Sequence, residues 1–324
     1  MSFWTNRRTL VTGCTGFLGS WLTAELVARG ADVVGLVRDG VWRSPFYLDG
    51  VSAKVDIVRG AVEDTVAVER AVNEYEIDTV FHLAAQAIVG AANRNPLSTF
   101  EANIKGTWVL MDACRRSPLV TRVVVASSDK AYGEHEHLPY TEDLPLQGRH
   151  PYDVSKSCAD LIAVTYHNTY RTPVCITRCG NLFGPGDLNF NRIVPGTIRA
   201  ALQGDRPVIR SDGSPVRDYV YVKDVVTAYL VLAERMDDSA LHGRAFNIGT
   251  GEPVSVLDLT RRTLAAAGRP DLEPLVQNTA SSEILRQYLD SGAAREVLGW
   301  SPGAGLDGRL RETAEWYRDH ALAA

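Results

Sequence analysis

The sequence lacks a long hydrophobic run and any strong excess of one charge. No stretch of its 324 residues approaches the ~18 apolar residues that span a bilayer, and the N-terminal MSFWTNRR has no apolar core before its arginine pair. The net charge is −5, with both signs scattered and no basic block. Nothing in this pattern favours a nucleic-acid or membrane partner, so we expect neither and place the chain in the cytoplasm.

Cysteine is scarce as well, and its spacing excludes a familiar metal site. The five cysteines are odd in number, and no two C-x-x-C pairs or histidines at metal-ligand spacing accompany them. We therefore expect no metal and predict reduced, mostly buried thiols at Cys14, Cys114, Cys158, Cys175 and Cys179.

Alternating strand and helix patterns dominate the first 180 residues. With 45% hydrophobic residues, the chain can bury a full core as one large domain or two interleaved ones. Short β-branched runs predict strands at 9–13, 32–37, 55–60, 79–85, 122–128 and 174–179. Helical periodicity predicts helices near 17–30, 64–75, 97–116 and 152–171. This order predicts an α/β fold, a Rossmann-type doubly wound parallel sheet.

The residue composition changes after Asn181. Residues 181–220 carry many Gly, Pro, Asn and Arg residues, which predicts a loop-rich stretch. A helix near 222–235 and a strand at 244–248 then rejoin the α/β pattern, and Gly299–Gly308 predicts a surface connection before a last amphipathic helix. We predict a dinucleotide-binding domain of residues 1–180 plus about 221–249, and a smaller interleaved α/β lobe of 181–220 and 250–324.

A glycine-rich turn, Thr12 to Gly19, follows the first predicted strand and opens a helix. Glycines let backbone N–H groups approach a phosphate, and the helix N-terminus adds partial positive charge. A tight turn without a ligand is the alternative. The spacing, G-x-x-G-x-x-G at Gly13, Gly16 and Gly19, resembles that of the extended short-chain dehydrogenase/reductase superfamily.

The end of the second strand bears on the choice between NAD and NADP. An acidic residue there binds ribose hydroxyls, whereas an arginine accommodates a 2′-phosphate. The chain offers both, Arg38 followed by Asp39, and a solvated pair is the alternative for either. Ala61 stands after Gly60, where the resembling family usually has an acidic residue. We predict NAD and leave NADP open.

Tyr152 and Lys156 lie one helical turn apart at the start of a predicted helix. A tyrosine with a pKa of about 10 must lose ~3 units, or ~4 kcal/mol, to act as a base near neutrality. A nearby ammonium and a cofactor cation can offset this cost. A solvated pair is the alternative, but the preceding glycine turn and a strand ending in serines favour a catalytic Tyr-x-x-x-Lys pattern, which the superfamily shares.

Ser128, Asp129 and Lys130 follow that strand, at the edge where doubly wound folds bind ligands. Ser128 can hydrogen bond a reacting alcohol and completes a hydride-transfer set with Tyr152 and Lys156. The triplet resembles that of nucleotide-sugar 4,6-dehydratases, which implies Asp129 as the acid and Lys130 as the base or an electrostatic partner. A plain ion pair on a loop is the alternative.

The resemblance extends over nearly the whole chain and is closest to CDP-glucose 4,6-dehydratases. It includes His82-Leu83-Ala84-Ala85-Gln86 and Arg178-Cys179-Gly180-Asn181, although Leu36-Val37-Arg38 is more similar to the NADP-using GDP-mannose 4,6-dehydratases. His82 itself is expected to be a packed strand residue. Besides Tyr152 and Lys156, the resemblance implies that the cofactor is contacted by Gly13, Thr15, Gly16, Phe17, Leu18, Gly19, Arg38, Asp39, Val62, Ala84, Ala85, Gln86 and Asn103.

Arginines in the second lobe suit a nucleotide-diphosphate sugar, because they bind phosphate bidentately. With the resemblance, the predicted substrate contacts are Gln86, Ser128, Asn181, Arg192, Val194, Arg217 and Arg286. Arg210 is a further candidate, and we expect about one of these four arginines to be merely solvated. Helices 97–116 and 152–171 carry apolar residues on more than one face, which favours a homodimer.

Three functions remain open at this point. The first is a nucleotide-sugar 4,6-dehydratase, a lyase that regenerates bound NAD in each turnover. The second is a nucleotide-sugar 4-epimerase, in which the Asp129-Lys130 pair is incidental. The third is a non-catalytic dinucleotide-binding protein, which the intact Ser128, Tyr152 and Lys156 set argues against.

Overall fold

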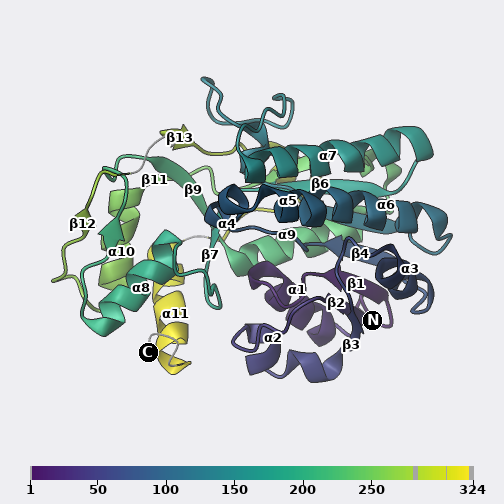
Figure 1. Cartoon of the computed structure of the whole chain (residues 1–324), viewed down its shortest axis with the longest axis horizontal. Coiled ribbons are helices and arrows are strands. Elements are labelled where there is room, and N and C mark those ends of the chain that lie inside the picture. The colour runs from purple at the N-terminus through teal and green to yellow at the C-terminus, as the bar shows by residue number, and fades with distance from the viewer. Residues whose placement is uncertain (1, 280–283, 304, 321–324) are drawn as a thin grey trace.

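A parallel sheet forms the centre of the computed structural model, which describes residues 2–279, 284–303 and 305–320 (Figure 1). Within these residues, seven strands are hydrogen bonded in the order β10-β6-β5-β4-β1-β2-β3. They are β1 (Arg8–Thr12), β2 (Asp32–Val37), β3 (Asp56–Arg59), β4 (Thr79–His82), β5 (Arg122–Ala126), β6 (Val174–Cys179) and β10 (Ala245–Ile248). The order reverses between β1 and β4, and ligands of doubly wound sheets bind at such a point. The predicted fold class is confirmed.

Helices cover both faces of this sheet. They are α1 (Phe17–Ala28), α3 (Thr65–Asn73), α4 (Val89–Arg94), α5 (Pro96–Phe100), α6 (Gly106–Arg116), α7 (Pro151–Tyr170) and α9 (Val222–Arg235), with short α2 (Pro45–Leu48) and η1 (Val51–Lys54) after β2. Strand residues alternate between the faces: Leu10 and Val123 pack with α3, α6 and α7, whereas Val11 and Val124 pack with α1 and α9. The predicted helix 97–116 is divided into α5, a π-turn at Glu101–Lys105 and α6.

The predicted strands are confirmed, although two of them end early. Strand β4 stops at His82, because the backbone N–H groups of Leu83 and Ala84 donate to the Thr12 hydroxyl at 3.1 and 3.2 Å. Strand β5 stops at Ala126, and a 3-10 turn, η3 (Asp129–Tyr132), follows it. The segments that follow β4 and β5 therefore both begin at the same edge of the sheet.

The expectation of a loop-rich stretch at 181–220 is wrong in part. This region contains β7 (Asn181–Phe183), α8 (Ile193–Gln203), β8 (Val208–Ile209) and most of β9 (Val216–Tyr221). Pro195 and Gly196, residue types typical of loops, lie in the first turn of α8, where the missing N–H of a proline costs no helical hydrogen bond.

A second core packs around β9. Strand β9 pairs with β7, β11 (Pro253–Ser255) and β13 (Arg286–Gln287), and β8 pairs with β12 (Leu275–Val276). Buried residues of α8 and β9 pack with α10 (Val256–Ala266) and α11 (Leu306–Asp319). The last connection is shorter than predicted, because α11 begins at Leu306 and contains Gly308.

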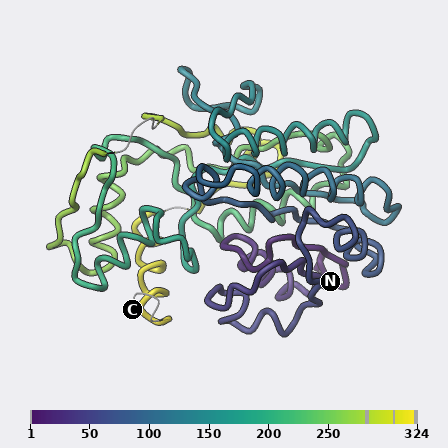
Figure 2. Tube along the Cα trace, viewed as in Figure 1, coloured from purple at the N-terminus to yellow at the C-terminus, as the bar shows by residue number. Residues whose placement is uncertain are grey.

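The chain returns to the large sheet once more before it ends. After β13, the π-turn at Ala294–Leu298 packs into the core beside α9, and the chain then enters α11 (Figure 2). The division into two interleaved lobes at the predicted boundaries stays a proposal.

Candidate active site

The glycine turn between β1 and α1 is packed too closely for side chains. Gly13 has φ +76°, and a Cβ there would lie 2.8 Å from the backbone nitrogen of Ala84. A Cβ on Gly19 would lie 2.0 Å from the Gly13 carbonyl oxygen. Gly16 precedes α1 without a side-chain cap, and no acidic residue lies in the first helical turn. The turn therefore leaves the first amides of α1 available to an anion and fits a pyrophosphate.

Thr15, Gly16, Phe17 and Leu18 line the outer side of this turn and are partly or fully exposed, whereas Cys14 is buried beneath it. All five cysteines are free, and four of them are buried, as predicted.

His82 is a structural residue of the sheet edge. Its Nδ1 lies 2.9 Å from the Thr12 hydroxyl, and its Nε2 lies 3.1 Å from the Thr107 hydroxyl. Thr12 accepts two backbone N–H groups, so its own proton points to Nδ1, while Thr107 donates to the Asn103 carbonyl at 2.6 Å. This network fits the neutral imidazole, and burial, aided by the charge of Lys156, lowers the pKa of His82 to about 3.

Asn103 ties three segments together. Its Oδ1 accepts the Gln86 N–H at 2.7 Å, and its Nδ2 donates to the Gln86 carbonyl and to the Ser155 hydroxyl. Ser155 in turn donates to the Tyr152 carbonyl at 2.7 Å. Asn103 lies in the π-turn before α6, an irregularity that is common at functional sites. It holds the chain after β4, including Ala84 and Ala85, against the start of α7.

Arg38 and Asp39 pair with each other at the end of β2. The Nε–Oδ2 distance is 2.6 Å, and both side chains are more than half exposed. Val62, predicted to contact the cofactor, is buried against Gly106, where a Cβ would lie 2.5 Å from its Cγ1.

Tyr152 and Lys156 lie in the first turns of α7, near Ser128. Burial raises the pKa of Tyr152 to about 12, and the charge of Arg192 and a hydrogen bond with Ser128 oppose this shift. Lys156 is buried and donates to the Ala126 carbonyl at 2.7 Å, while burial lowers its pKa to about 8. The structure thus brings the predicted hydride-transfer residues together at the carboxyl end of β5.

Asp129 and Lys130 form an ion pair beside Ser128. The Lys130 Nζ lies 3.1 Å from Asp129 Oδ2, and the Ser128 hydroxyl donates to Asp129 Oδ1 at 3.0 Å. Lys130 also donates to Gln287 Oε1. These contacts hold the Asp129 carboxyl between the Ser128 hydroxyl and the Lys130 ammonium. The alternative of a loop ion pair without a role must therefore explain why Asp129 is almost fully buried.

The predicted substrate residues lie on both sides of this centre. Arg192 precedes α8 and binds the buried Asp187 at 3.1 Å, and its charge acts on Tyr152. Val194 is buried in α8, and Asn181 begins β7. Arg217 on β9 lies opposite Gln287 in register, and Arg286 is the residue before Gln287 on β13. Arg210, which is exposed and bonded to Asn191, is the arginine that best fits a merely solvated role.

Sequence patterns do not identify one functional candidate, Gln287. It is fully buried and contacts both Asp129 and Lys130. The sequence carries no signal for it, because the contact joins segments 157 residues apart.

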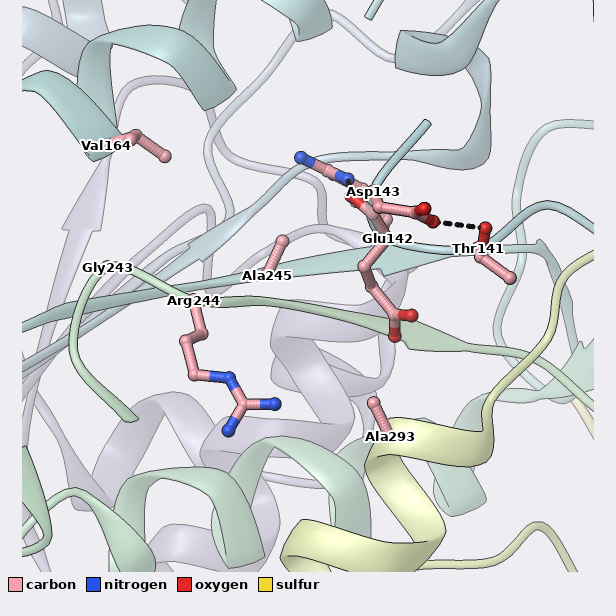
Figure 3. A pocket seen from close by; sticks show the side chains of 9 residues that line it. Thr141, Glu142, Asp143, Val164, Gly243, Arg244, Ala245 and Ala293 are labelled. Carbon is pink, nitrogen blue, oxygen red and sulfur yellow. Dashed lines mark hydrogen bonds between the residues drawn. The ribbon is translucent and has the colours of Figure 1, made fainter. Parts of the chain in front are cut away.

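A separate hollow lies at the β10 edge of the large sheet (Figure 3). Figure 3 shows Glu142, Arg244 and Ala293 on its wall. Arg178, which also lines it, is held by Asp160 in a bidentate ion pair. Its nine lining residues all differ from the predicted site residues, so we do not assign the reaction to it.

A family model, described as the NAD dependent epimerase/dehydratase family, matches residues 9–249. The chain belongs to this family. Membership confirms NAD as the predicted cofactor, and the glycine cradle described above fits it.

Members of this family with both activities resemble the chain. The CDP-glucose 4,6-dehydratase of Salmonella typhimurium is 28% identical, and the match covers 98% of this chain and 92% of that protein. The UDP-glucose 4-epimerase of Mycolicibacterium smegmatis is 33% identical, with 96% and 99% covered. The chain is thus a nucleotide-sugar epimerase or dehydratase by family, and overall identity does not separate the two.

Solved structures that resemble the chain also include both epimerases and dehydratases. The UDP-glucose 4-epimerase of Thermotoga maritima, with UDP-glucose, superposes with a TM-score of 0.88 at 29% identity, covering 97% of this chain and 99% of that one. The dTDP-glucose 4,6-dehydratase DesIV of Streptomyces venezuelae, with NAD, gives a TM-score of 0.86 at 28% identity, covering 96% and 97%.

Proposed function

We propose that this protein is a nucleotide-sugar 4,6-dehydratase. The observation that carries the proposal is the ion pair between the buried Asp129 and the partly exposed Lys130, which lies directly beside Ser128. Oxidation and reduction at one sugar carbon need a hydroxyl base and a cofactor, but no additional acid and base. Loss of water from C5 and C6 does need them. The pair supplies both in the same turn as the serine.

Bound NAD supplies the hydride acceptor and donor. Tyr152 takes the proton of the C4 hydroxyl, and Ser128 hydrogen bonds the same oxygen. Because burial raises the pKa of Tyr152 to about 12, reaching neutrality requires roughly 5 units, about 7 kcal/mol, of stabilisation of the phenolate. Lys156 and, when NAD is bound, the positive nicotinamide ring would provide it, in addition to the charge of Arg192 that already opposes the rise.

Asp129 and Lys130 act together in the elimination. The 3.1 Å contact favours Lys130 as the electrostatic partner of Asp129, because its side chain is directed at the carboxyl group. Asp129 takes the C5 proton and gives a proton to the C6 hydroxyl, which leaves as water. With NAD bound, the hydride taken from C4 would return to C6, and the proton that Tyr152 took from the C4 hydroxyl would pass to C5, so both residues end the turnover as they began it. Water is the product that leaves.

The substrate is a nucleotide-diphosphate hexose, and CDP-glucose is our first candidate. Arg192 approaches from α8, while Arg217 and Arg286 approach from β9 and β13, so cationic donors reach the diphosphate from two directions. Asn181 and Gln86 offer hydrogen bonds to the sugar and its phosphate. Arg38 and Asp39 lie together at the end of β2, where side chains of this fold meet the cofactor ribose.

Incubation with CDP-, UDP-, GDP- and dTDP-hexoses followed by mass spectrometry tests this function. A product lighter by one water supports the dehydratase. An isomer of unchanged mass contradicts it and supports the 4-epimerase. No turnover of any of the sugars supports the binding protein.

Two substitutions test the role of the pair. Asp129→Asn and Lys130→Ala should both stop water loss, while hydride exchange at C4 persists, because Ser128, Tyr152 and Lys156 are unchanged. Normal dehydration by both variants would show that the pair is incidental.

We further propose a homodimer in the cytoplasm. Trp108 on α6 is 44% exposed, and Leu161 and Tyr170 on α7 are each 55% exposed. Helices α6 and α7 lie side by side in Figure 1 and contact each other, so these apolar side chains form a surface that two copies can share. Among the described residues, no helix is both long and apolar enough to cross a membrane.

A further inference from the structure

Gln287 reaches from the small sheet into the turn that carries the acid–base pair. It lies on β13 and is fully buried. Its Nε2 donates to the Asp129 carbonyl at 3.0 Å and to the Gly133 carbonyl at 3.4 Å, and its Oε1 accepts from Lys130 Nζ. One side chain therefore bonds both ends of the η3 turn and the lysine within it.

The amide of Gln287 matches its surroundings in one orientation only. Its two N–H groups face two carbonyl oxygens, and its oxygen faces an ammonium. The reversed amide would place N–H against the ammonium and oxygen against the carbonyls, so none of these hydrogen bonds could form. A buried polar group without partners is destabilised, and the orientation is therefore well defined.

Lys130 is restrained by this contact. Its side chain is 21% exposed and has Asp129 Oδ2 on one side and Gln287 Oε1 on the other. A lysine has four rotatable bonds and loses much freedom when it is held in one position. The hydrogen bond to Gln287 restrains the Lys130 ammonium from a second side, which Asp129, its neighbour in sequence, cannot do alone.

Strands β13 and β9 connect this contact to the predicted diphosphate arginines. Gln287 lies opposite Arg217 in the β9–β13 pairing, and Arg286 precedes it. The next residue, Tyr288, accepts the Tyr140 N–H at 2.9 Å, which anchors β13 to the segment that follows η3. A displacement of β13 would move Gln287 and its bonded lysine together.

We propose that Gln287 is a positioning residue that holds the Lys130 ammonium against Asp129 and links its position to the strand that carries Arg286. This inference rests on the proposed dehydratase function where elimination is concerned. The contact itself can be measured without turnover.

Three variants separate the contributions. Gln287→Met keeps the approximate shape and removes every polar contact, whereas Gln287→Glu keeps an oxygen for Lys130. Gln277→Met is the matched control, because the Gln277 side chain is exposed and its backbone bonds Ile209 on β8. If Gln287→Met does not fold, Gln287→Asn, which is one methylene too short to reach Lys130, replaces it.

The first measurement is the rate at which acetic anhydride labels Lys130, read by mass spectrometry on the tryptic peptide 123–149, with Lys105 as the internal standard. Labelling of Lys130 should rise in Gln287→Met and stay near the wild-type rate in Gln287→Glu and Gln277→Met. Unchanged labelling in Gln287→Met overturns the proposal, whatever reaction the protein catalyses.

The second measurement compares two steps of the reaction. In Gln287→Met, water loss should fall about 10- to 100-fold, the effect of removing one hydrogen bond to a charged group. Reduction of the bound cofactor and KM should stay within about twofold, and Gln287→Glu should recover most of the water-loss rate. Equal losses in both steps, or unchanged water loss, overturn the positioning role. If wild-type protein yields only isomers, the dehydratase proposal fails, and the labelling result alone decides the role of Gln287.

Discussion

Replacement of Gly19 by alanine should weaken NAD binding through a steric clash, because Gly19 does not have the positive φ at which alanine itself is strained. The added Cβ would lie 2.0 Å from the Gly13 carbonyl oxygen, whereas real contacts of this kind need more than 3 Å. Helix α1 must therefore shift by about 1 Å or more away from the turn, and its first backbone N–H groups then no longer point at the phosphates.

The size of the effect follows from the hydrogen bonds that this shift breaks. Hydrogen bonds to charged groups contribute about 1.5–3 kcal/mol each. Loss of one or two amide–phosphate bonds should therefore weaken NAD binding by about 3 kcal/mol, which corresponds to roughly 100-fold in Kd. Isothermal titration calorimetry with NAD measures this change directly.

Two other glycines serve as controls for the same experiment. Gly50→Ala adds a Cβ at φ +67° with nothing within 4 Å, so it introduces strain alone, about 1 kcal/mol in urea unfolding, and should leave NAD affinity unchanged. Gly13→Ala combines strain at φ +76° with a contact 2.8 Å from the Ala84 nitrogen and should lose both stability and affinity. Wild-type affinity in Gly19→Ala would refute the assignment of this turn as the phosphate cradle.

Three further predictions concern stability, pH and assembly. His82 has a folded pKa near 3, below its usual 6.5, so the folded state binds fewer protons and stability falls as pH drops through this window. Between pH 7.5 and pH 5, the free energy of unfolding measured in urea should fall by about 2 kcal/mol more in the wild type than in His82→Gln. Equal falls would contradict a buried, neutral His82. Because the charge of Arg192 lowers the pKa of Tyr152, Arg192→Met should move the rising limb of the pH profile of kcat/KM to higher pH. Arg192→Lys keeps the charge and should leave the profile in place. An unshifted profile in Arg192→Met would show that the charge of Arg192 does not act on Tyr152. Leu161→Glu should yield a monomer in light scattering, while Val66→Glu, at a position 74% exposed on α3, should leave the dimer intact, and a dimer that survives both changes would place the interface elsewhere.

Local patterns predict much of the fold and part of the candidate site. The glycine turn can be recognised because a phosphate cradle is built from consecutive residues. Tyr152 and Lys156 can be paired because one helical turn brings them to the same side. Their placement beside Ser128 follows from the parallel sheet, whose strands end at one edge.

Composition is a weaker guide where the structure depends on packing. Pro195 and Gly196 favour a loop at the position of α8, yet the apolar residues of this helix are buried against α10 and α11. Burial of an apolar face outweighs weak local propensity. The sequence also presents Arg38 and Asp39 as alternatives, whereas the fold pairs them with each other.

The parallel sheet, the cofactor turn and the predicted hydride-transfer residues can all be read from the sequence alone, because each depends on short-range spacing and strand direction. The way in which Asp129 and Lys130 are held becomes visible only in the folded molecule. Their partner, Gln287, arrives from a strand 157 residues away, and no period in the chain encodes a hydrogen bond over that separation. The direction of the Lys130 ammonium depends on every group around it, and those groups meet only when β13 is packed against the turn that carries Asp129 and Lys130.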